Sequence, residues 1–191
     1  MFEFNFPEWD KELFVYLNSK HIPWLDPVML FLSNQWVWTF VCLAVFLLIL
    51  FYKKQPDKRA ALFYAGGLLS TFLVNNLLKL VFMRPRPGNE DLLKEIIHQL
   101  EEMGKSFSFF SSHSSASLFV AMFGTFFFRN TYYGIALFVW AFSVAYSRIY
   151  VGKHYPLDVF VGIAFGLLMG YITYWGYRKN YNSISSPSKP K

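Results

Sequence analysis

Cysteine and charged side chains are both scarce in this chain. The one cysteine, Cys42, lies inside an apolar run, so no disulfide can form within the chain. Charged residues make up 16% of the sequence, and the basic ones flank apolar runs instead of forming one stripe. This distribution disfavours nucleic acid as a partner, although the net charge is +6. The first residues are acidic and lack a basic region followed by an apolar one, so we expect no cleaved signal peptide.

Apolar side chains, by contrast, are abundant. Hydrophobic residues make up 54% of the chain and aromatic residues 21%, which is above the usage of soluble proteins. They gather in runs at residues 36–52, 60–82, 114–128, 132–147 and 156–177. A helix needs about 20 apolar residues to cross a membrane, and the third and fourth runs are shorter than that. We therefore expect an all-α membrane helical bundle of five to six spans, forming one domain over residues 1–178.

Three other segments are expected to lie outside the hydrocarbon. Residues 1–34 read as amphipathic segments at the membrane interface, where Trp9 and Trp24 are favoured. In residues 90–103 the apolar side chains fall mostly on one helical face, which predicts an interfacial amphipathic helix near the functional site. Residues 179–191 have the composition of a disordered cytoplasmic tail.

The charges of the loops predict which side of the membrane each faces. With five spans, the loop at 53–59, Arg129 and the residues after the fifth run, 178–191, share one side and hold nine Lys or Arg against one acid, Asp57. By the positive-inside rule that side is cytoplasmic. We expect a bacterial inner-membrane protein whose loops around 79–105 and 147–158 face the periplasm or the outside.

A polar stretch between the last two apolar runs carries the first functional signal. Ionisable residues between membrane-length segments are functional candidates, because hydrocarbon makes them costly. Pro156 suits the first position of a helix, which places Asp158 in the first turn and His154 just ahead of it. A His beside a carboxylate, with Arg148 nearby, could act as a nucleophile on an anion. Interfacial anchors and a helix N-terminal charge are the alternative reading of these residues.

Two further polar patches fall on the same side by the parity of the spans. Lys79 ends the second run and is followed by Arg84 and Arg86, set among prolines. Guanidinium groups bind phosphate in a bidentate fork, although snorkelling anchors would also explain single cations here. Residues 110–115 open the third run with serines around His113. A helix start with free N–H groups binds anions, although serine there is also an ordinary N-cap. Together the three patches indicate phosphoryl chemistry.

The spacing of these patches resembles that of a known family. Lys79, six intervening residues and Arg86-Pro87 are similar to the first motif of the type 2 phosphatidic acid phosphatase family. Ser147-Arg148, five residues, His154, three residues and Asp158 are similar to its third motif. The middle motif of that family is Pro-Ser-Gly-His, where this chain has Phe110-Ser111-Ser112-His113. The resemblance covers residues 36–177, and it departs at Phe110 and at Ser112, where the family has proline and glycine.

The resemblance implies a helical-bundle lipid phosphatase related in site chemistry to vanadium-dependent haloperoxidases. His154 would attack phosphorus and form a phosphohistidine, Asp158 would orient its ring, and His113 would protonate the leaving oxygen and later activate water. The phosphate would be held by Lys79, Arg86, Ser111, Ser112 and Arg148. Fixed cations would replace a metal, so we expect neither a metal ion nor another cofactor.

Several alternatives stay open. A lipid phosphotransferase would use the same residues with a lipid alcohol in place of water, and an inactive membrane scaffold would be expected to have lost one of the three catalytic residues. A metal site at His113, His154 and Asp158 is disfavoured by the neighbouring cations Arg148 and Lys153. The resemblance allows phosphatidate, phosphatidylglycerol phosphate, polyprenyl diphosphate or lipid A phosphate as the substrate. We favour the last two, which are lipids of the bacterial envelope.

Overall fold

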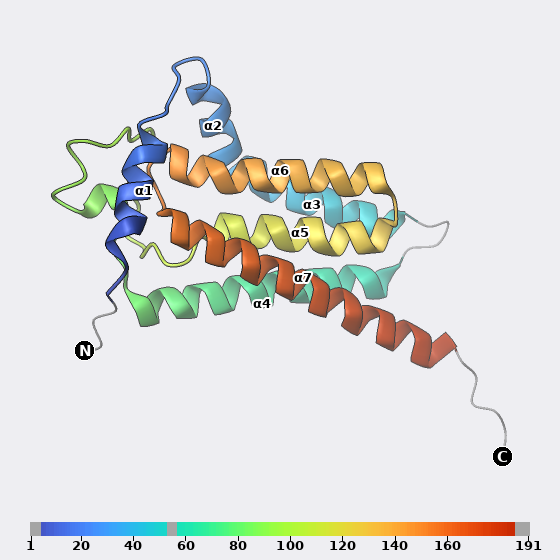
Figure 1. Ribbon diagram of the computed structural model, residues 1–191. Helices are drawn as coiled ribbons and strands as arrows, with labels where there is room; N and C mark the ends of the chain where they lie inside the picture. Colours follow the sequence, from blue (N-terminus) through green and yellow to red (C-terminus); the bar gives the residue numbers. More distant parts are fainter. Residues whose placement is uncertain (1–4, 53–56, 186–191) are drawn as a thin grey trace.

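The computed structural model describes residues 5–52 and 57–185. These residues form α-helices and one 3₁₀ turn, η1, with no strand among them, so the all-α prediction is confirmed (Figure 1). The helices are α1 (Glu8–Asn18), α2 (Asp26–Ser33), α3 (Gln35–Phe51), α4 (Lys58–Phe82), α5 (Ser112–Phe128), α6 (Thr131–Tyr150) and α7 (Pro156–Ser185).

The five longer helices, α3 to α7, lie side by side with their axes roughly aligned, and the chain direction alternates from one helix to the next (Figure 1). Helix α5 lies in the middle and contacts the other four. Nearly every residue from Ser114 to Phe128 on it is buried, because its small and apolar side chains face neighbours all round. Helix α5 is therefore the core of the bundle, and its N-terminus lies at the same end as the start of α7.

A stripe of glycines on α7 brings that helix against α5. Gly162, Gly166 and Gly170 recur every four residues, so they share one face. A Cβ atom on Gly166 would lie 2.1 Å from the carbonyl oxygen of Ser115, and one on Gly162 would lie 2.9 Å from that of Ser111. Small residues allow this backbone-to-backbone contact between apolar helices. The close packing fixes the distance between the two helix starts that carry the candidate site.

The outer faces of the bundle are apolar and exposed. The exposed side chains include Phe40, Leu47, Leu69, Leu73, Ile135, Val139, Phe142, Leu168 and Ile172. Two helical stretches, Lys58–Asn89 and Pro156–Tyr181, are long and apolar enough to cross a membrane, and α2 with α3, bent by 56°, would give a third. Apolar surface of this extent is unfavourable in water and favourable in lipid. The helices thus indicate an integral membrane protein.

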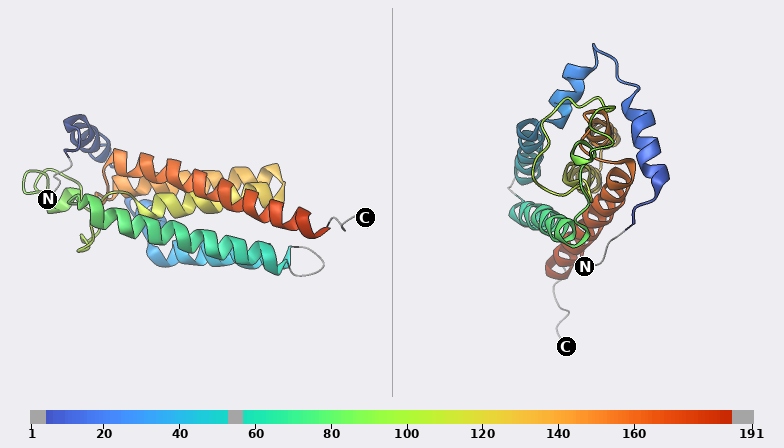
Figure 2. Two further views of the ribbon diagram at one scale, coloured as in Figure 1. Left: turned by 90° about the horizontal axis from the view of Figure 1, so that it is seen from below. Right: turned by 90° about the vertical axis from the view of Figure 1, so that its left-hand side faces the viewer.

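The N-terminal segment lies across one end of the bundle. Seen from that end, α1 and α2 flank the ends of the longer helices, with the connection at 83–111 between them (Figure 2). Helix α1 buries Asp10, Phe14 and Asn18 on one face and exposes the other, as an amphipathic helix does. Helix α1 and the last turns of α7 lie at opposite ends of the bundle (Figure 1).

Residues 90–103 do not form the predicted amphipathic helix. After η1 (Pro87–Asn89) the chain continues in turns. Its backbone is bound by distant residues instead: the Asn18 side chain accepts from the His98 N–H at 2.6 Å and donates to the His98 carbonyl oxygen at 3.1 Å. The Leu100 N–H donates to the Val151 carbonyl oxygen at 3.4 Å. These contacts use backbone groups that a helix would have paired internally, so tertiary contacts override the helical periodicity.

The C-terminal helix is longer than the apolar pattern indicates. Helix α7 continues to Ser185, so the first part of the segment expected to be a disordered tail, 179–185, is helical. The rest of that segment, 186–191, lies outside the described residues.

Candidate active site

Polar residues from separate elements meet around one cavity of about 340 Å³ at the end of the bundle near α1. Six of the residues singled out in the sequence line it: Lys79, Arg86, Ser112, His113, Arg148 and His154. They come from the last turns of α4 and α6, the first turn of α5, and the two connections at this end. Lys153 adds a fourth cation to the described lining, which contains no Asp or Glu. This concentration of buried positive charge suits an anion.

Arg86 is fixed in the cavity wall by its own donors. Its Nε and Nη2 donate to the carbonyl and hydroxyl oxygens of Ser106, each at 2.8 Å. Its Nη1 lies 3.2 Å from the carbonyl oxygen of Lys153 and 3.4 Å from Nε2 of His154. A guanidinium held in this way presents charge to the cavity without having to be ordered on binding.

Arg148 is held from the opposite side by α2. Its Nη1 donates to the carbonyl oxygen of Ser33 at 2.9 Å and also contacts the Ser33 hydroxyl. That hydroxyl bonds Glu101, which in turn pairs with Nζ of Lys153 at 2.5 Å. Burial alone would raise the pKa of Glu101, but the bonds from Lys153 and Ser33 and the charge of Arg148 lower it. The buried Nε of Arg148 has no hydrogen-bond partner, so one strong donor stays available beside the cavity.

The ring of His154 is oriented by a serine as well as by an acid. The hydroxyl of Ser108 contacts Oδ2 of Asp158 closely and lies 3.3 Å from Nδ1 of His154. Asp158 Oδ2 lies 3.5 Å from the same Nδ1 and accepts the N–H of Tyr155 at 3.1 Å. An ionised Asp158 accepts a hydrogen bond from the Ser108 hydroxyl, so the serine oxygen accepts from Nδ1–H of His154, and this pattern assigns the tautomer. The lone pair on Nε2 then faces the cavity.

The surroundings of His154 keep it neutral. The pKa of His154 lies well below its ordinary value of 6.5, because burial takes the ring out of water and the charges of Arg86, Lys79 and Arg148 oppose its protonation. A neutral imidazole with a free Nε2 has the electron pair that a nucleophile needs.

The first turn of α5 supplies a second imidazole. The Nε2 atom of His113 is buried and has no hydrogen-bond partner, and its ring lies 5.6 Å from that of Trp38. The hydroxyl of Ser112, which stands in place of the family glycine, bonds Oδ1 of Asn75. Asn75 also donates to the carbonyl oxygen of Phe110 at 2.9 Å, so it holds the start of α5 in place.

Two of the predicted site residues lie behind the cavity. Asp158 is fully buried beneath His154. Ser111 is also fully buried: its hydroxyl accepts from Ser114 as an N-cap, and its N–H donates to the Asp158 carbonyl oxygen at 3.1 Å. Ser111 therefore links the start of α5 to the start of α7. Within the described part of the chain, no three His, Cys, Asp or Glu side chains are grouped to hold a metal ion.

The sequence did not reveal Ser108 or Asp10 as parts of this site. Arg84, which the sequence grouped with the phosphate-binding cations, faces away from the cavity and pairs with Asp10 and Asp158. The one sequence signal for Ser108 is its position, three residues before the Ser111–His113 motif. Asp10 is far away in the sequence, and no local pattern marks it.

The chain is similar to known membrane-lipid phosphatases. The model of the PAP2 superfamily matches residues 60–182. A lipid A 4'-phosphatase of Porphyromonas gingivalis is 33% identical over 96% of this chain and 80% of its own length. The undecaprenyl-diphosphatase BcrC of Bacillus subtilis is 28% identical over 81% of this chain and 76% of its own length.

Solved structures agree in fold. LpxE of Aquifex aeolicus superposes with a TM-score of 0.71 at 25% identity, covering 88% of this chain and 96% of that one. A PAP2-type phosphatidylglycerolphosphate phosphatase of Bacillus subtilis superposes with a TM-score of 0.70 at 22% identity, covering 95% of this chain and 88% of that one. The motif resemblance is thus confirmed, and this chain belongs to the PAP2 superfamily.

Proposed function

We propose that this protein removes phosphate from a lipid of the bacterial envelope through a phosphohistidine on His154, without a metal ion. The observation that carries the proposal is the cavity itself. Four buried or half-buried cations surround it, and both Nε2 of His113 and Nε of Arg148 are buried there without partners. Buried polar groups are normally paired, so these atoms indicate a bound anion with oxygens to accept from them.

Among envelope lipids we propose a phosphate of lipid A. The support is the lipid A 4'-phosphatase of Porphyromonas gingivalis, whose similarity runs through almost the whole of this chain. Neutral hydrogen-bonding side chains, Gln35 and Asn76, line the cavity beside its cations and could bind the hydroxyls of a sugar headgroup. Undecaprenyl diphosphate is the second candidate, because BcrC is also similar over most of the chain.

In the first step of the proposed reaction, His154 displaces the lipid. Lys79, Arg86 and Arg148 hold the phosphate oxygens, and a phosphate oxygen replaces Nε2 of His154 as the acceptor of one N–H of Arg86 Nη1. Nε2 then forms the bond to phosphorus as the bond to the lipid oxygen breaks. His113, protonated when the anionic phosphate is bound beside it, gives that oxygen its proton, so the lipid leaves as an alcohol. The proton on Nδ1 stays bonded to Ser108, and the charge of Asp158 stabilises the cationic ring.

In the second step water releases the phosphate. His113, now neutral, takes a proton from water as the water oxygen bonds phosphorus and the bond to His154 breaks. Inorganic phosphate leaves, and both imidazoles return to their starting states. The fixed cations supply the charge that a divalent metal supplies in other phosphatases. A phosphotransferase would follow the same path with a lipid hydroxyl in the place of water.

For the membrane we propose that α3 to α7 each cross it, with the cavity at the periplasmic or outer surface. The support is the common direction of their axes and the apolar outer faces of the bundle (Figure 1). Helix α5 has 17 residues and is about 25 Å long, shorter than the hydrocarbon, but its buried position spares it contact with lipid. Its polar first turn can then lie just below the surface.

Phosphate release by the purified chain in detergent tests the function. Lipid A, undecaprenyl diphosphate, phosphatidylglycerol phosphate and phosphatidate would be compared at equal surface concentration, with His154→Ala as the inactive control. We expect the highest kcat/KM with lipid A, persistence in excess chelator, inhibition by vanadate, and free phosphate as the product instead of a second phosphorylated lipid. No release from any of the four, or full activity of His154→Ala, would refute the proposal. Preference for undecaprenyl diphosphate would refute only the choice of substrate.

A further inference from the structure

Behind the cavity, Arg84 is buried between two carboxylates. Its Nη1 lies 2.7 Å from Oδ1 of Asp158 and its Nη2 lies 2.6 Å from Oδ2 of Asp10. The guanidinium is stacked between the rings of Phe6 and Tyr155, with centroids 4.0 and 3.8 Å away. A planar cation held on both edges and both faces cannot turn toward the cavity. Arg84 therefore serves the carboxylates and not the phosphate.

Asp10 reaches this position from α1, which lies outside the segment that the family model matches. Its side chain is fully buried, and its Oδ1 accepts the N–H of Leu157 in the first turn of α7 at 2.8 Å. Burial raises the pKa of Asp10, while the bonds from Arg84 and Leu157 favour its ionised form. The N-terminal helix thus contributes a buried charge directly to the base of the catalytic helix.

The charges of this group do not cancel. Asp10 and Asp158 carry two negative charges and Arg84 carries one positive charge, so the three together keep a net charge of about −1. Without the charge of Asp10, the positive charge of Arg84 would be paired with Asp158 only and would cancel its negative charge. Four contacts in series then link Asp10 to the ring of His154, running through Arg84, Asp158 and Ser108.

Elsewhere around His154 the charged groups are almost all positive. The charged or titratable side chains that face it are Lys79 of α4, Arg86 of its loop, His113 of α5, Arg148 of α6, and Asp158 of α7. Lys153, beside it in the chain, is paired with Glu101. Asp158 is therefore the group that can stabilise positive charge on the ring when Nε2 bonds phosphorus, provided that Arg84 does not cancel it.

We infer that Asp10 is a positioning residue for catalysis: by occupying Arg84, it leaves the charge of Asp158 available to His154. The inference rests on the proposed role of His154 as nucleophile. It gives α1 a part in the reaction, although no atom of α1 lines the cavity among the residues described. The competing explanation is that Asp10 only fastens α1 to the start of α7 through Leu157.

Replacing Asp10 by asparagine separates the two explanations. Asp10→Asn keeps the shape and an oxygen for the Leu157 N–H but removes the charge. Asp10→Ser also removes the charge, so the test can be made if either Asp10→Asn or Asp10→Ser folds. Asp10→Glu restores the charge. Glu12→Gln is the matched control, because Glu12 is an exposed acid on the same helix. Each variant would be compared with wild type and with His154→Ala for phosphate release from lipid A in detergent, from pH 8 down to a pH below the acid-side break in the wild-type kcat/KM.

We expect kcat of Asp10→Asn to fall roughly ten- to a hundredfold, as is usual when a supporting partner is lost, with little change in KM. Loss of a negative charge also makes His154 harder to protonate, so the ratio of variant to wild-type kcat/KM should rise as the pH falls. That ratio is insensitive to titration of the substrate. For Asp10→Glu the ratio of variant to wild-type kcat/KM should be the same at every pH, even if the kcat of this variant is below that of wild type.

A rate loss with a ratio that does not change with pH would overturn the inference in favour of the fastening role. A rate of Asp10→Asn or Asp10→Ser equal to that of Glu12→Gln would overturn it as well. Both results leave the proposed function standing, provided that wild type is active and His154→Ala is not. An inactive wild type, or an active His154→Ala, would instead remove the function on which the inference rests.

Discussion

At the scale of single residues, the unexpected member of the site is Ser108. It separates His154 from the acid that the sequence assigns to it, so the imidazole donates to a hydroxyl that donates to Asp158. A serine in this place can relay the stabilising effect of the carboxylate without forming an ion pair that would hold the ring protonated. Its contribution can be measured directly.

Ser108→Ala should lower kcat by roughly tenfold to a hundredfold, because Nδ1–H of His154 loses the hydroxyl that connects it to Asp158, so the ring is less firmly held in one tautomer. KM should change little, since Ser108 does not line the cavity. Ser143→Ala, which removes an exposed hydroxyl from α6, is the control. Equal kcat values for the two variants would show that Asp158 orients His154 without the serine.

The two histidines should respond differently to the leaving group. His154→Ala should abolish turnover of every phosphate ester, since no covalent intermediate can form. His113→Ala should slow a lipid substrate by about 100-fold or more and an aryl phosphate much less, because an aryl oxygen leaves without a proton. Rapid quenching of His113→Ala should trap phosphate on His154. Label on His113 instead, or equal sensitivity of both variants to the leaving group with no trapped intermediate, would overturn this assignment of roles.

The pH dependence follows from the lowered pKa of His154. In the proposed reaction the ring attacks only when neutral, and it is neutral above its pKa, so activity should persist below pH 6.5 and fall only at more acidic pH. The measurement is kcat/KM against pH, corrected for titration of the substrate phosphate, which is followed separately by phosphorus NMR. An acid-side break, at which kcat/KM falls as the pH is lowered, at or above pH 6.5 after that correction would contradict the lowered pKa of His154.

At the scale of elements, the contact between α5 and α7 determines whether the site can assemble. Gly166→Ala would place a methyl group 2.1 Å from the backbone oxygen of Ser115, which cannot move without shifting α5. Overpacking of this kind costs about 1–3 kcal/mol, so both Tm in detergent and phosphate release should fall. Gly66→Ala is the matched control, because nothing lies within 4 Å of its Cβ position. Equal Tm values for the two variants would mean that α7 is free to move away from α5.

The elements also show where sequence reasoning succeeds and where it fails. Apolar runs locate the five long helices, and the parity of those runs places the three motifs at one end, as the helix ends in the structure do. The segment at 90–103 was assigned wrongly because its helical periodicity is local, whereas Asn18 and Val151, which bind its backbone, are remote. The link from Asp10 to Arg84 is invisible for the same reason, since it joins residues from α1 and from beyond α4.

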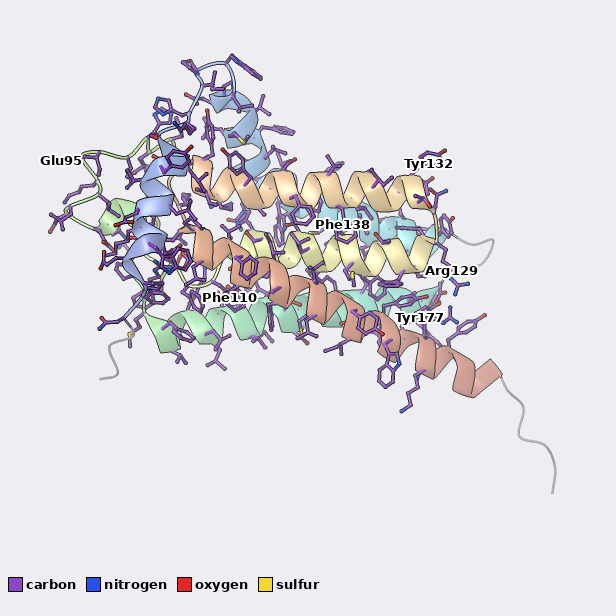
Figure 3. The ribbon with its side chains drawn as sticks, viewed as in Figure 1. Glu95, Phe110, Arg129, Tyr132, Phe138 and Tyr177 are labelled. Carbon is purple, nitrogen blue, oxygen red and sulfur yellow. The ribbon has the colours of Figure 1, made fainter. Side chains whose placement is uncertain are left out.

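At the scale of the whole molecule, the two ends of the bundle differ in charge. Glu95 projects from the connection at the cavity end, and Arg129 lies at the other end (Figure 3). Accessibility of cysteines to a membrane-impermeant maleimide tests the proposed orientation. In intact spheroplasts Lys94→Cys should be labelled and Arg129→Cys should not, until the membrane is permeabilised. Cys42 is buried and gives little background. The opposite pattern of labelling would invert the topology.

The connection that covers the cavity has a consequence for how such proteins diversify. It contains little regular structure, and a few side chains, among them Asn18 and Glu90, bind it to the helices. The two histidines of the proposed reaction instead belong to, or adjoin, helices packed backbone to backbone. Arg86 and Ser108, near the two ends of this connection, belong to the site, whereas residues 91–97 in its middle line no part of the cavity. That middle part can therefore differ in length and sequence between relatives while the side chains that surround the phosphate are inherited unchanged.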